Sequence, residues 1–239
     1  MQSINYPSVN YSDRKKSAVI DTIVIHHTAT NDLETALKIL TQNQYQVSSH
    51  YVIDKDGSVY YLVHENKKAW HAGISSWRGR EGMNDYSIGI ELVNNGFQAF
   101  PEKQMDALIE LCLGIMDRHN IDQRNVIGHF DVAPKRKIDP NEFFDWKKLF
   151  ENGIGLYSTL SSDSQDVLYY IGDRSEFVSD VRNRLGEFGY KISGNDLYDA
   201  ELNAVIMAFK RHYSIETYGI YGWDVLADAR LNDIMESYV

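Results

Sequence analysis

The sequence predicts an α/β fold, with a central mixed β-sheet flanked by helices, followed by a small C-terminal three-helix domain. Strand-like β-branched runs alternate with helical patterns over the first 150 residues. A stretch rich in Gly, Ser, Asp and Tyr follows, and the rest of the chain shows only helical spacing. We therefore expect one domain over residues 1–150, a linker over 151–174 and a second domain over 175–239.

The first half of the expected sheet begins with a buried strand and contains a hairpin. Residues 21–28 are a β-branched run that ends in polar groups. Asp56 and Gly57 separate two strand-like runs, residues 49–54 and 58–63, and an Asp-Gly pair in this place is typical of a hairpin turn. The pattern also predicts a polar arm over residues 1–20, a capped helix over 31–43 and a long surface loop over 69–84.

The second half of the domain is organised around a strand at residues 87–93. Alternation places Ile88, Ile90 and Leu92 on one face of this strand, with Gly89 and Glu91 on the other. The remaining expected elements are a helix over 101–118, a short strand over 125–129, a loop over 130–140, a short helix over 141–150, and three C-terminal helices near residues 178–188, 202–209 and 223–235.

Composition limits the classes of partner. Lys and Arg number 24 and Asp and Glu number 34, so the net charge is −10 and nucleic acid is an unfavourable partner. Cys112 is the single cysteine, so an intrachain disulfide is excluded. It falls within an apolar helical pattern, and we expect it to be a small core residue. No apolar run is long enough to span a membrane, and no secretion signal is visible. A cytoplasmic protein and one whose leader has been removed both fit that absence.

Three residues have the chemistry and placement of a metal site. His26 and His129 each stand at the end of a predicted strand, and Asp139 can return from the loop after His129. A catalytic zinc site uses three nitrogen or oxygen ligands from the protein and leaves one position open. The alternative is that each histidine only makes a structural hydrogen bond at a strand end, which is a frequent role.

Glu91 and Lys137 add the other parts of a hydrolytic mechanism. A carboxylate within an apolar strand needs a partner or a function, because burial of an unpaired charge is costly. Beside a metal site Glu91 is suited to accept a proton from water, and Gly89 would leave room for it. Lys137 is suited to stabilise an oxyanion. The alternatives are a solvent-facing strand position for Glu91 and an ordinary solvated lysine for Lys137.

Four motifs, in order along residues 18–150, resemble those of the type-2 N-acetylmuramoyl-L-alanine amidases. That family includes bacterial anhydro-muramyl amidases, phage amidases and animal peptidoglycan-recognition proteins. The motifs are IHHTA at 25–29, WHAG at 70–73, NDYSIGIE at 84–91 and GHFDVAPKRKIDP at 128–140. Four motifs in the family's order are far more specific than any one of them.

The resemblance implies roles for individual residues. It implies one zinc ion held by His26, His129 and Asp139, with His26 rather than His27 as the first ligand. Glu91 matches the position that activates the water, and Lys137 matches the one that stabilises the transition state. We expect the residues that match the substrate groove to be Trp70, His71, Ala72 and Asn84.

The C-terminal part is similar to the three-helix peptidoglycan-binding module. The likeness runs from VRNRLG at 181–186 to FKR at 209–211. The module's usual Asp-Gly-x-Phe-Gly turn is replaced by NDLYD at 195–199, which puts glycan binding in doubt but not the fold. A helical bundle that serves dimerisation is the alternative.

The resemblance implies zinc-dependent hydrolysis of the bond between N-acetylmuramic or 1,6-anhydro-muramic acid and L-alanine, in peptidoglycan or muropeptides. Two alternatives share the scaffold or the metal chemistry. A non-catalytic peptidoglycan receptor typically lacks a ligand, whereas all the ligand positions are filled here, and a zinc peptidase would instead cut within the stem peptide. A wall-binding module favours the cell envelope as the location, with the cytoplasm as the alternative.

Overall fold

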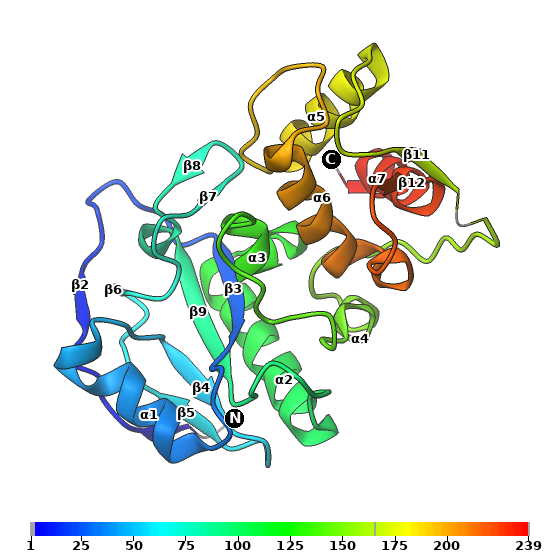
Figure 1. Ribbon diagram of the computed structural model, residues 1–239. Helices are drawn as coiled ribbons and strands as arrows, with labels where there is room; N and C mark the ends of the chain where they lie inside the picture. The colour runs from blue at the N-terminus through cyan, green and yellow to red at the C-terminus, as the bar shows by residue number, and fades with distance from the viewer. Residues whose placement is uncertain (1–2, 165, 239) are drawn as a thin grey trace.

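The computed structural model describes residues 3–164 and 166–238, and its architecture is a mixed sheet between helical layers (Figure 1). Residues 1–2 of the expected arm, residue 165 of the expected linker and residue 239 of the expected second domain lie outside the described residues. The six strands of the sheet, in spatial order, are β1 (Ile4–Asn5), β5 (Val59–Tyr61), β4 (Tyr51–Ile53), β9 (Ser87–Leu92), β3 (Thr22–His27) and β10 (Val126–Gly128).

The directions of the strands confirm the mixed sheet. β5 and β4 pair antiparallel, as the Asp-Gly hairpin predicts, and Gly57 at that turn has a φ of 89°. The other four pairings in the sheet are parallel. Since β4, β9, β3 and β10 run in the same direction, their carboxyl ends lie at one edge, where open α/β sheets place their ligands.

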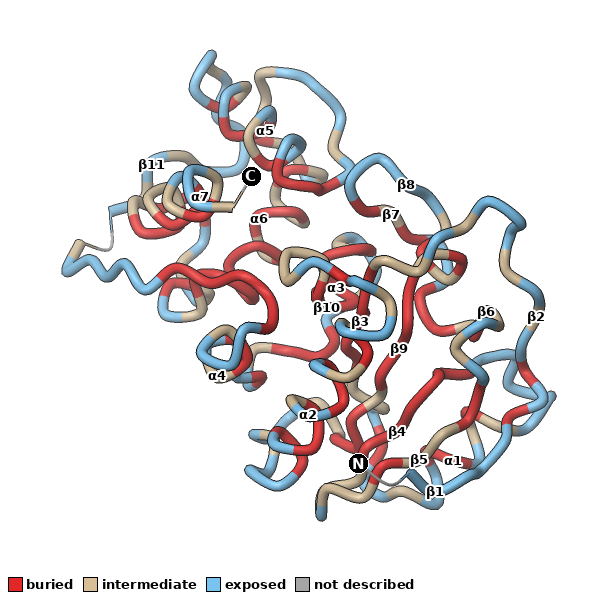
Figure 2. Tube along the Cα trace, turned by 180° about the vertical axis from the view of Figure 1, so that it is seen from behind, coloured by how far each residue is buried: buried red, intermediate tan, exposed pale blue. Residues whose placement is uncertain are grey.

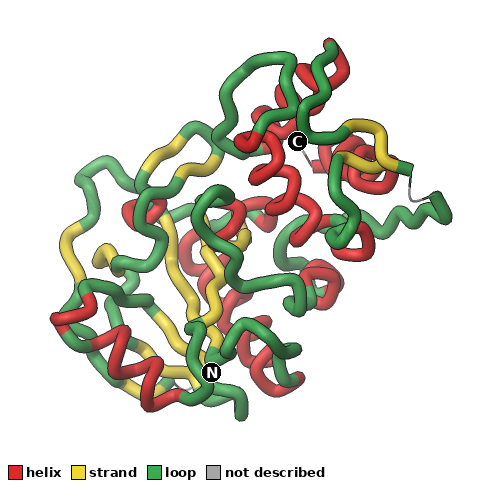
Figure 3. Tube along the Cα trace, viewed as in Figure 1, coloured by secondary structure: helices red, strands yellow, loops and turns green. Residues whose placement is uncertain are grey.

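Helices cover both faces of this sheet (Figure 3). α1 (Leu33–Thr41) packs with Val52 of β4, whereas α2 (Glu102–His119) belongs to the core that contains Ile53. Successive residues of a strand face opposite sides, so the two helices lie on opposite faces. Asp32 caps α1 by accepting a hydrogen bond from the Thr35 amide, as its capping pattern predicts. Cys112 is fully buried in α2, as expected for a small core residue.

The structure differs from the prediction in several segments. α3 (His129–Val132) is a helical turn where a loop was expected. α4 (Trp146–Glu151) begins later than the expected helix because Asn141 has a φ of 84° and Asp145 caps the helix start. The arm and the long loop contribute short strand pairs, β2 (Tyr11–Asp13) with β6 (Lys67–Ala69) and β7 (Ser76–Trp77) with β8 (Arg80–Glu81).

Three helices in the C-terminal part confirm the predicted helical character. They are α5 (Glu176–Phe188), α6 (Ala200–Tyr213) and α7 (Val225–Tyr238), with a small strand pair of β11 (Val167–Tyr169) and β12 (Trp223–Asp224). Their apolar faces join the same buried core as α2 and the sheet. Figure 2 shows buried backbone running from the central strands into α6. In the described part of the chain, no helix is both long and apolar enough to cross a membrane.

Candidate metal and catalytic site

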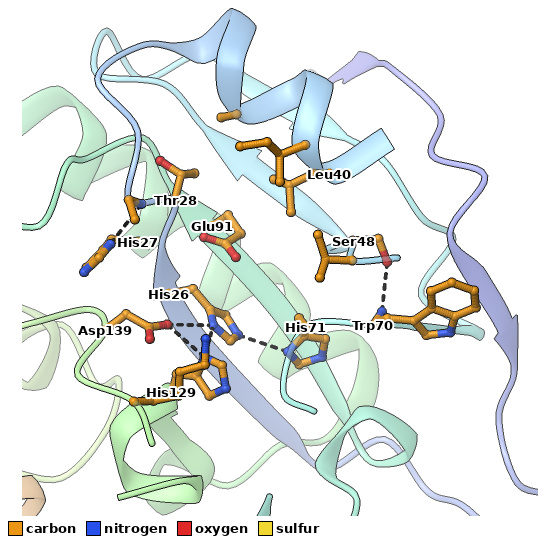
Figure 4. A pocket seen from close by; sticks show the side chains of 15 residues that line it. His26, His27, Thr28, Leu40, Ser48, Trp70, His71, Glu91, His129 and Asp139 are labelled. Carbon is orange, nitrogen blue, oxygen red and sulfur yellow. Dashed lines mark hydrogen bonds and ion pairs between the residues drawn. The ribbon is translucent and has the colours of Figure 1, made fainter. Parts of the chain in front are cut away.

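Two histidines and an aspartate meet at the carboxyl end of the sheet (Figure 4). His26 lies at the end of β3, His129 directly follows β10, and Asp139 returns on the loop after α3. Nδ1 of His26 is 2.9 Å from Nδ1 of His129 and 3.0 Å from Oδ2 of Asp139. The remaining pair, Nδ1 of His129 and Oδ2 of Asp139, is 2.9 Å apart. All three residues are buried, and together they form a group that could hold a metal ion.

The hydrogen bonds around His129 leave its ligand atom without a proton. Nε2 of His129 is 3.1 Å from the carbonyl oxygen of Ala72, and a carbonyl only accepts. The proton of a neutral His129 ring is therefore on Nε2, and Nδ1 presents a lone pair to the Asp139 carboxylate. Two acceptors that face each other at this distance repel unless a proton or a metal ion lies between them. The chemistry of the donor set thus fits a metal ion.

Burial and mutual contact set the charge of the group. Burial, together with the neighbouring His129 ring, lowers the pKa of His26 to about 4, so His26 is neutral at pH 7. Burial opposes ionisation of Asp139, but the contacts with His129 and His26 outweigh it and hold the pKa of the carboxyl well below its usual range. Neutral imidazole and ionised carboxylate are the forms that bind a metal.

Glu91 lies beside the metal group on the neighbouring strand. In the β3–β9 ladder His26 pairs with Glu91, so the two side chains share the face of the sheet opposite the apolar core. Figure 4 shows the Glu91 carboxyl in the same space as His26 and Asp139. Burial and the negative charge of Asp139 raise the pKa of Glu91 to about 8. Its Oε2 atom has no hydrogen-bond partner among the described residues.

The site opens into a cavity of about 220 Å³. Lys137 lines it, held on a turn in which the Lys137 amide donates to the Ala133 carbonyl. The apolar side chains of Ile39 and Leu40 from α1 also line the cavity, as does Trp70. The cavity therefore combines a metal-ligand group, a carboxyl of raised pKa and an ammonium group, which suits hydrolysis of a polar bond.

Comparison with known proteins names the family to which this arrangement belongs. Residues 15–142 match the family model described as N-acetylmuramoyl-L-alanine amidase. The chain belongs to this amidase family. It is therefore an enzyme, and the resemblance carried by the four motifs is confirmed.

Similarity extends to relatives of nearly the same length. The amidase is 38% identical to the N-acetylmuramoyl-L-alanine amidase AmiD of Escherichia coli in an alignment of 214 residues that covers 81% of this chain and 75% of AmiD. A solved complex of AmiD with anhydro-N-acetylmuramic acid-L-Ala-D-gamma-Glu-L-Lys matches with a TM-score of 0.78 and 35% identity, over 94% of this chain and 93% of that one. AmpDh3 of Pseudomonas aeruginosa matches with a TM-score of 0.78 and 29% identity, over 100% of this chain and 99% of that one.

Only some of the residues that the sequence predicts at the substrate groove line the cavity of the amidase. Trp70 and His71 line the cavity, although His71 is only 9% exposed. Ala72 is fully buried. Oδ1 of Asn84 accepts hydrogen bonds from the amides of His71 and Ala72, so Asn84 holds the shape of their loop. Neither Ala72 nor Asn84 is among the described residues that line the cavity.

Two residues that support the amidase site were not predicted. Arg14 donates to backbone carbonyls on both sides of the loop that carries His71, and Ser87 contacts the His71 ring. Arg14 lies in a polar arm beside two lysines, where no local pattern distinguishes it from a solvated cation. Ser87 is the first residue of β9, two residues before Gly89, so the sequence shows that both lie on one face of the strand but not that Ser87 contacts His71.

Proposed function

We propose that this amidase uses one zinc ion to hydrolyse the amide bond between N-acetylmuramic acid, or its 1,6-anhydro form, and L-alanine in peptidoglycan or muropeptides. The observation that carries the proposal is that the His26, His129 and Asp139 group and the Glu91 carboxyl share one cavity. The bound ligand of the AmiD complex contains an anhydro-muramic acid joined to L-Ala, which supports this substrate class.

His26, His129 and Asp139 are the residues that would hold the zinc ion. Two imidazole nitrogens and one carboxylate oxygen match the three protein ligands of a catalytic zinc site. When bound, zinc supplies Lewis acidity, which polarises a carbonyl and makes water a stronger acid. The same donor set also occurs in iron(II) sites, so elemental analysis of the purified protein decides between the two metals. We expect about one zinc per chain, and loss of that zinc in Asp139→Ala.

Glu91 and Lys137 would perform the proton transfer and the charge stabilisation. The Glu91 carboxylate accepts a proton from water as the water oxygen bonds to the lactyl carbonyl carbon. Lys137 stabilises the negative charge that develops on the carbonyl oxygen. Glu91 then returns the proton to the alanine nitrogen as the carbon–nitrogen bond breaks, which leaves a lactyl carboxylic acid and a free amine. A pKa raised toward neutrality suits a group that both takes and gives a proton.

The Glu91→Ala variant tests the mechanism. We expect it to keep zinc and to turn over at least about 10²-fold more slowly, because general acid–base catalysis typically contributes about 10²–10⁴-fold. Zinc content and hydrolysis are measured on the same preparation. An active Glu91→Ala enzyme would exclude Glu91 as the general base.

Mass spectrometry of the digestion products tests the substrate bond. Stem peptide that begins with a free L-Ala amine is the expected product, from ordinary or from anhydro-muropeptides. Cleavage inside the stem would instead identify a peptidase, and binding without any product would identify a receptor.

We also propose that residues 175–239 form a peptidoglycan-binding-like domain and that the protein works in the cell envelope. The similarity of the helical segment to wall-binding modules supports both statements. Sedimentation of Glu91→Ala with insoluble peptidoglycan tests the first, and cell fractionation tests the second. A protein that stays in the supernatant and in the cytoplasmic fraction would contradict them.

A further inference from the structure

His71 is enclosed between the ligand His26 and strand β9. Its Nδ1 atom is 3.0 Å from Nε2 of His26, and its Nε2 atom is 3.2 Å from Oγ of Ser87. Ser87 is fully buried, and His71 is nearly so. Figure 4 shows the His71 ring directed at His26. Both ring nitrogens of His71 are therefore engaged within the protein.

Ser87, His71 and His26 form a series of hydrogen bonds that ends at the Met83 carbonyl, and this carbonyl sets which group donates at each step. The Ser87 hydroxyl donates to the Met83 carbonyl at 2.6 Å, so the Ser87 oxygen is free to accept from His71. His71 then carries its proton on Nε2 and has a lone pair on Nδ1. That lone pair accepts from Nε2–H of His26, which leaves Nδ1 of His26 without a proton, on the side of Asp139 and His129.

We propose that His71 and Ser87 are positioning residues that fix the tautomer and the orientation of His26 for metal binding. This inference rests on the metal site of the proposed function. It assigns His71 to the support of the metal ligand rather than to substrate contact. A metal-bound histidine usually donates its second N–H to a carboxylate, a carbonyl or water. His129 follows that rule through the Ala72 carbonyl, whereas His26 depends on two side chains.

Gly89 provides the space that this arrangement needs. A Cβ atom at Gly89 would lie 2.5 Å from Cγ of His71 and 2.7 Å from its Nδ1, closer than real contacts allow. The Gly89 amide also donates to Nδ1 of His50, whose ring packs edge-on against His71. The room beside Gly89, which the sequence assigned to Glu91, is thus occupied by His71. Gly89→Ala should displace His71 without removing any of its polar atoms.

Zinc affinity in competition with a chromophoric chelator is the decisive measurement. His71→Phe keeps a ring but removes the acceptor, and we expect zinc to bind 10–100-fold more weakly, the range found for lost outer-shell partners. Gly89→Ala should weaken binding in the same direction. His71→Asn can present an oxygen near the position of Nδ1, so it should recover much of the affinity. At saturating zinc, KM should remain within about twofold of the wild-type value.

The controls separate this inference from the metal site itself. His64→Phe makes the same exchange at an exposed histidine and should leave zinc affinity unchanged. His26→Ala should abolish tight binding, and if it does not, the proposed metal site and this inference both fail. If His26→Ala abolishes binding while His71→Phe and Gly89→Ala bind zinc normally, only the positioning role fails. A raised KM with normal zinc affinity in His71→Phe would instead identify a substrate contact.

Nitrogen-15 NMR of the metal-free protein gives a readout that does not depend on activity. The wild-type His26 ring should show a single tautomer with its proton on Nε2. In Ser87→Ala and His71→Phe the Nδ1–H tautomer should become populated. A His26 ring that stays entirely in the Nε2–H form in both variants would overturn the positioning role.

Discussion

At the scale of single residues, the Glu91 carboxyl lies where its ionised form is destabilised. Its carboxyl is next to Asp139 and lies in a place where the described residues leave one of its oxygens without a hydrogen bond. The ionised form is therefore disfavoured, and the pKa is raised from 4.5 to about 8. A carboxyl with a pKa of about 8 can exchange a proton near neutral pH, and its ionisation weakens the folded state.

This imbalance predicts a pH-dependent effect of Glu91→Gln on the metal-free protein. The folded state keeps a proton on Glu91 that the unfolded chain releases near pH 4.5, so the free energy of unfolding falls as the pH rises from about 4.5 to about 8. Glutamine cannot ionise, so the variant should melt above the wild type by a margin that grows over this range. Each kcal/mol corresponds to about 2–4 °C in a chain of this size. Melting curves at several pH values measure the margin.

The matched control is Glu187→Gln, at an exposed position of α5. Its melting temperature should run parallel to the wild type across the same pH range. A constant difference between Glu91→Gln and the wild type would contradict a raised pKa at Glu91.

At the scale of elements, the N-terminal arm holds the segment that carries His71. The Arg14 guanidinium donates to the carbonyls of Glu65, Asn84, Asp85 and Ser87, at 2.9–3.1 Å. These carbonyls flank both ends of the long loop, so one side chain fixes the loop to the start of β9. A planar fork of donors can satisfy several carbonyls at once, which lysine cannot.

Removal of this side chain should destabilise the whole fold. In Arg14→Met several partly buried carbonyls lose a charged donor, and we expect a loss of roughly 2–5 kcal/mol in the free energy of unfolding. Arg14→Lys should lose less, because it keeps the charge and can reach one or two of the carbonyls. Urea titration measures both. A loss below about 1 kcal/mol in Arg14→Met would show that the arm is not needed to hold the loop.

At the scale of the whole molecule, the C-terminal helices and the sheet domain share one core. Asp131, in the turn that begins at the candidate ligand His129, accepts hydrogen bonds from the Tyr190 hydroxyl at 2.6 Å and from Nδ1 of His212 at 2.7 Å. The His212 ring stacks on Trp146 of α4 with centroids 3.6 Å apart. The helical turn that presents His129 is thus supported by α6 and by Tyr190, two residues after the end of α5.

The shared core predicts that the protein unfolds in a single calorimetric transition. Tyr190→Phe removes one hydrogen bond to a buried carboxylate, which is worth about 1.5–3 kcal/mol, so the whole transition should move to lower temperature. Tyr221→Phe makes the same exchange at an exposed tyrosine and should leave the transition in place. Two separate transitions, of which Tyr190→Phe moves only one, would mean that the two parts fold independently.

Local patterns predicted the main strands and helices and drew attention to the candidate ligands. β-Branched runs predicted β3 and β9, and the Asp-Gly pair predicted the hairpin of β4 and β5. Alternation along β9 placed Glu91 opposite the core, and the structure has it there. Side-chain directions repeat every two residues in a strand and every 3.6 residues in a helix. These features can therefore be recognised within a short stretch of sequence.

Only the tertiary structure decided how the site is supported. The hydrogen bond between His26 and His71 joins residues 45 apart in sequence, and that between Asp131 and His212 joins residues 81 apart. No local period encodes such pairs, because they form where separate elements pack. The sequence therefore identified the candidate residues of the site, which are His26, His129, Asp139, Glu91 and Lys137. Packing determined which nitrogen of His26 faces Asp139 and His129, and it placed His71 rather than Glu91 in the space beside Gly89. Packing also brought α6 against the helical turn that begins at His129.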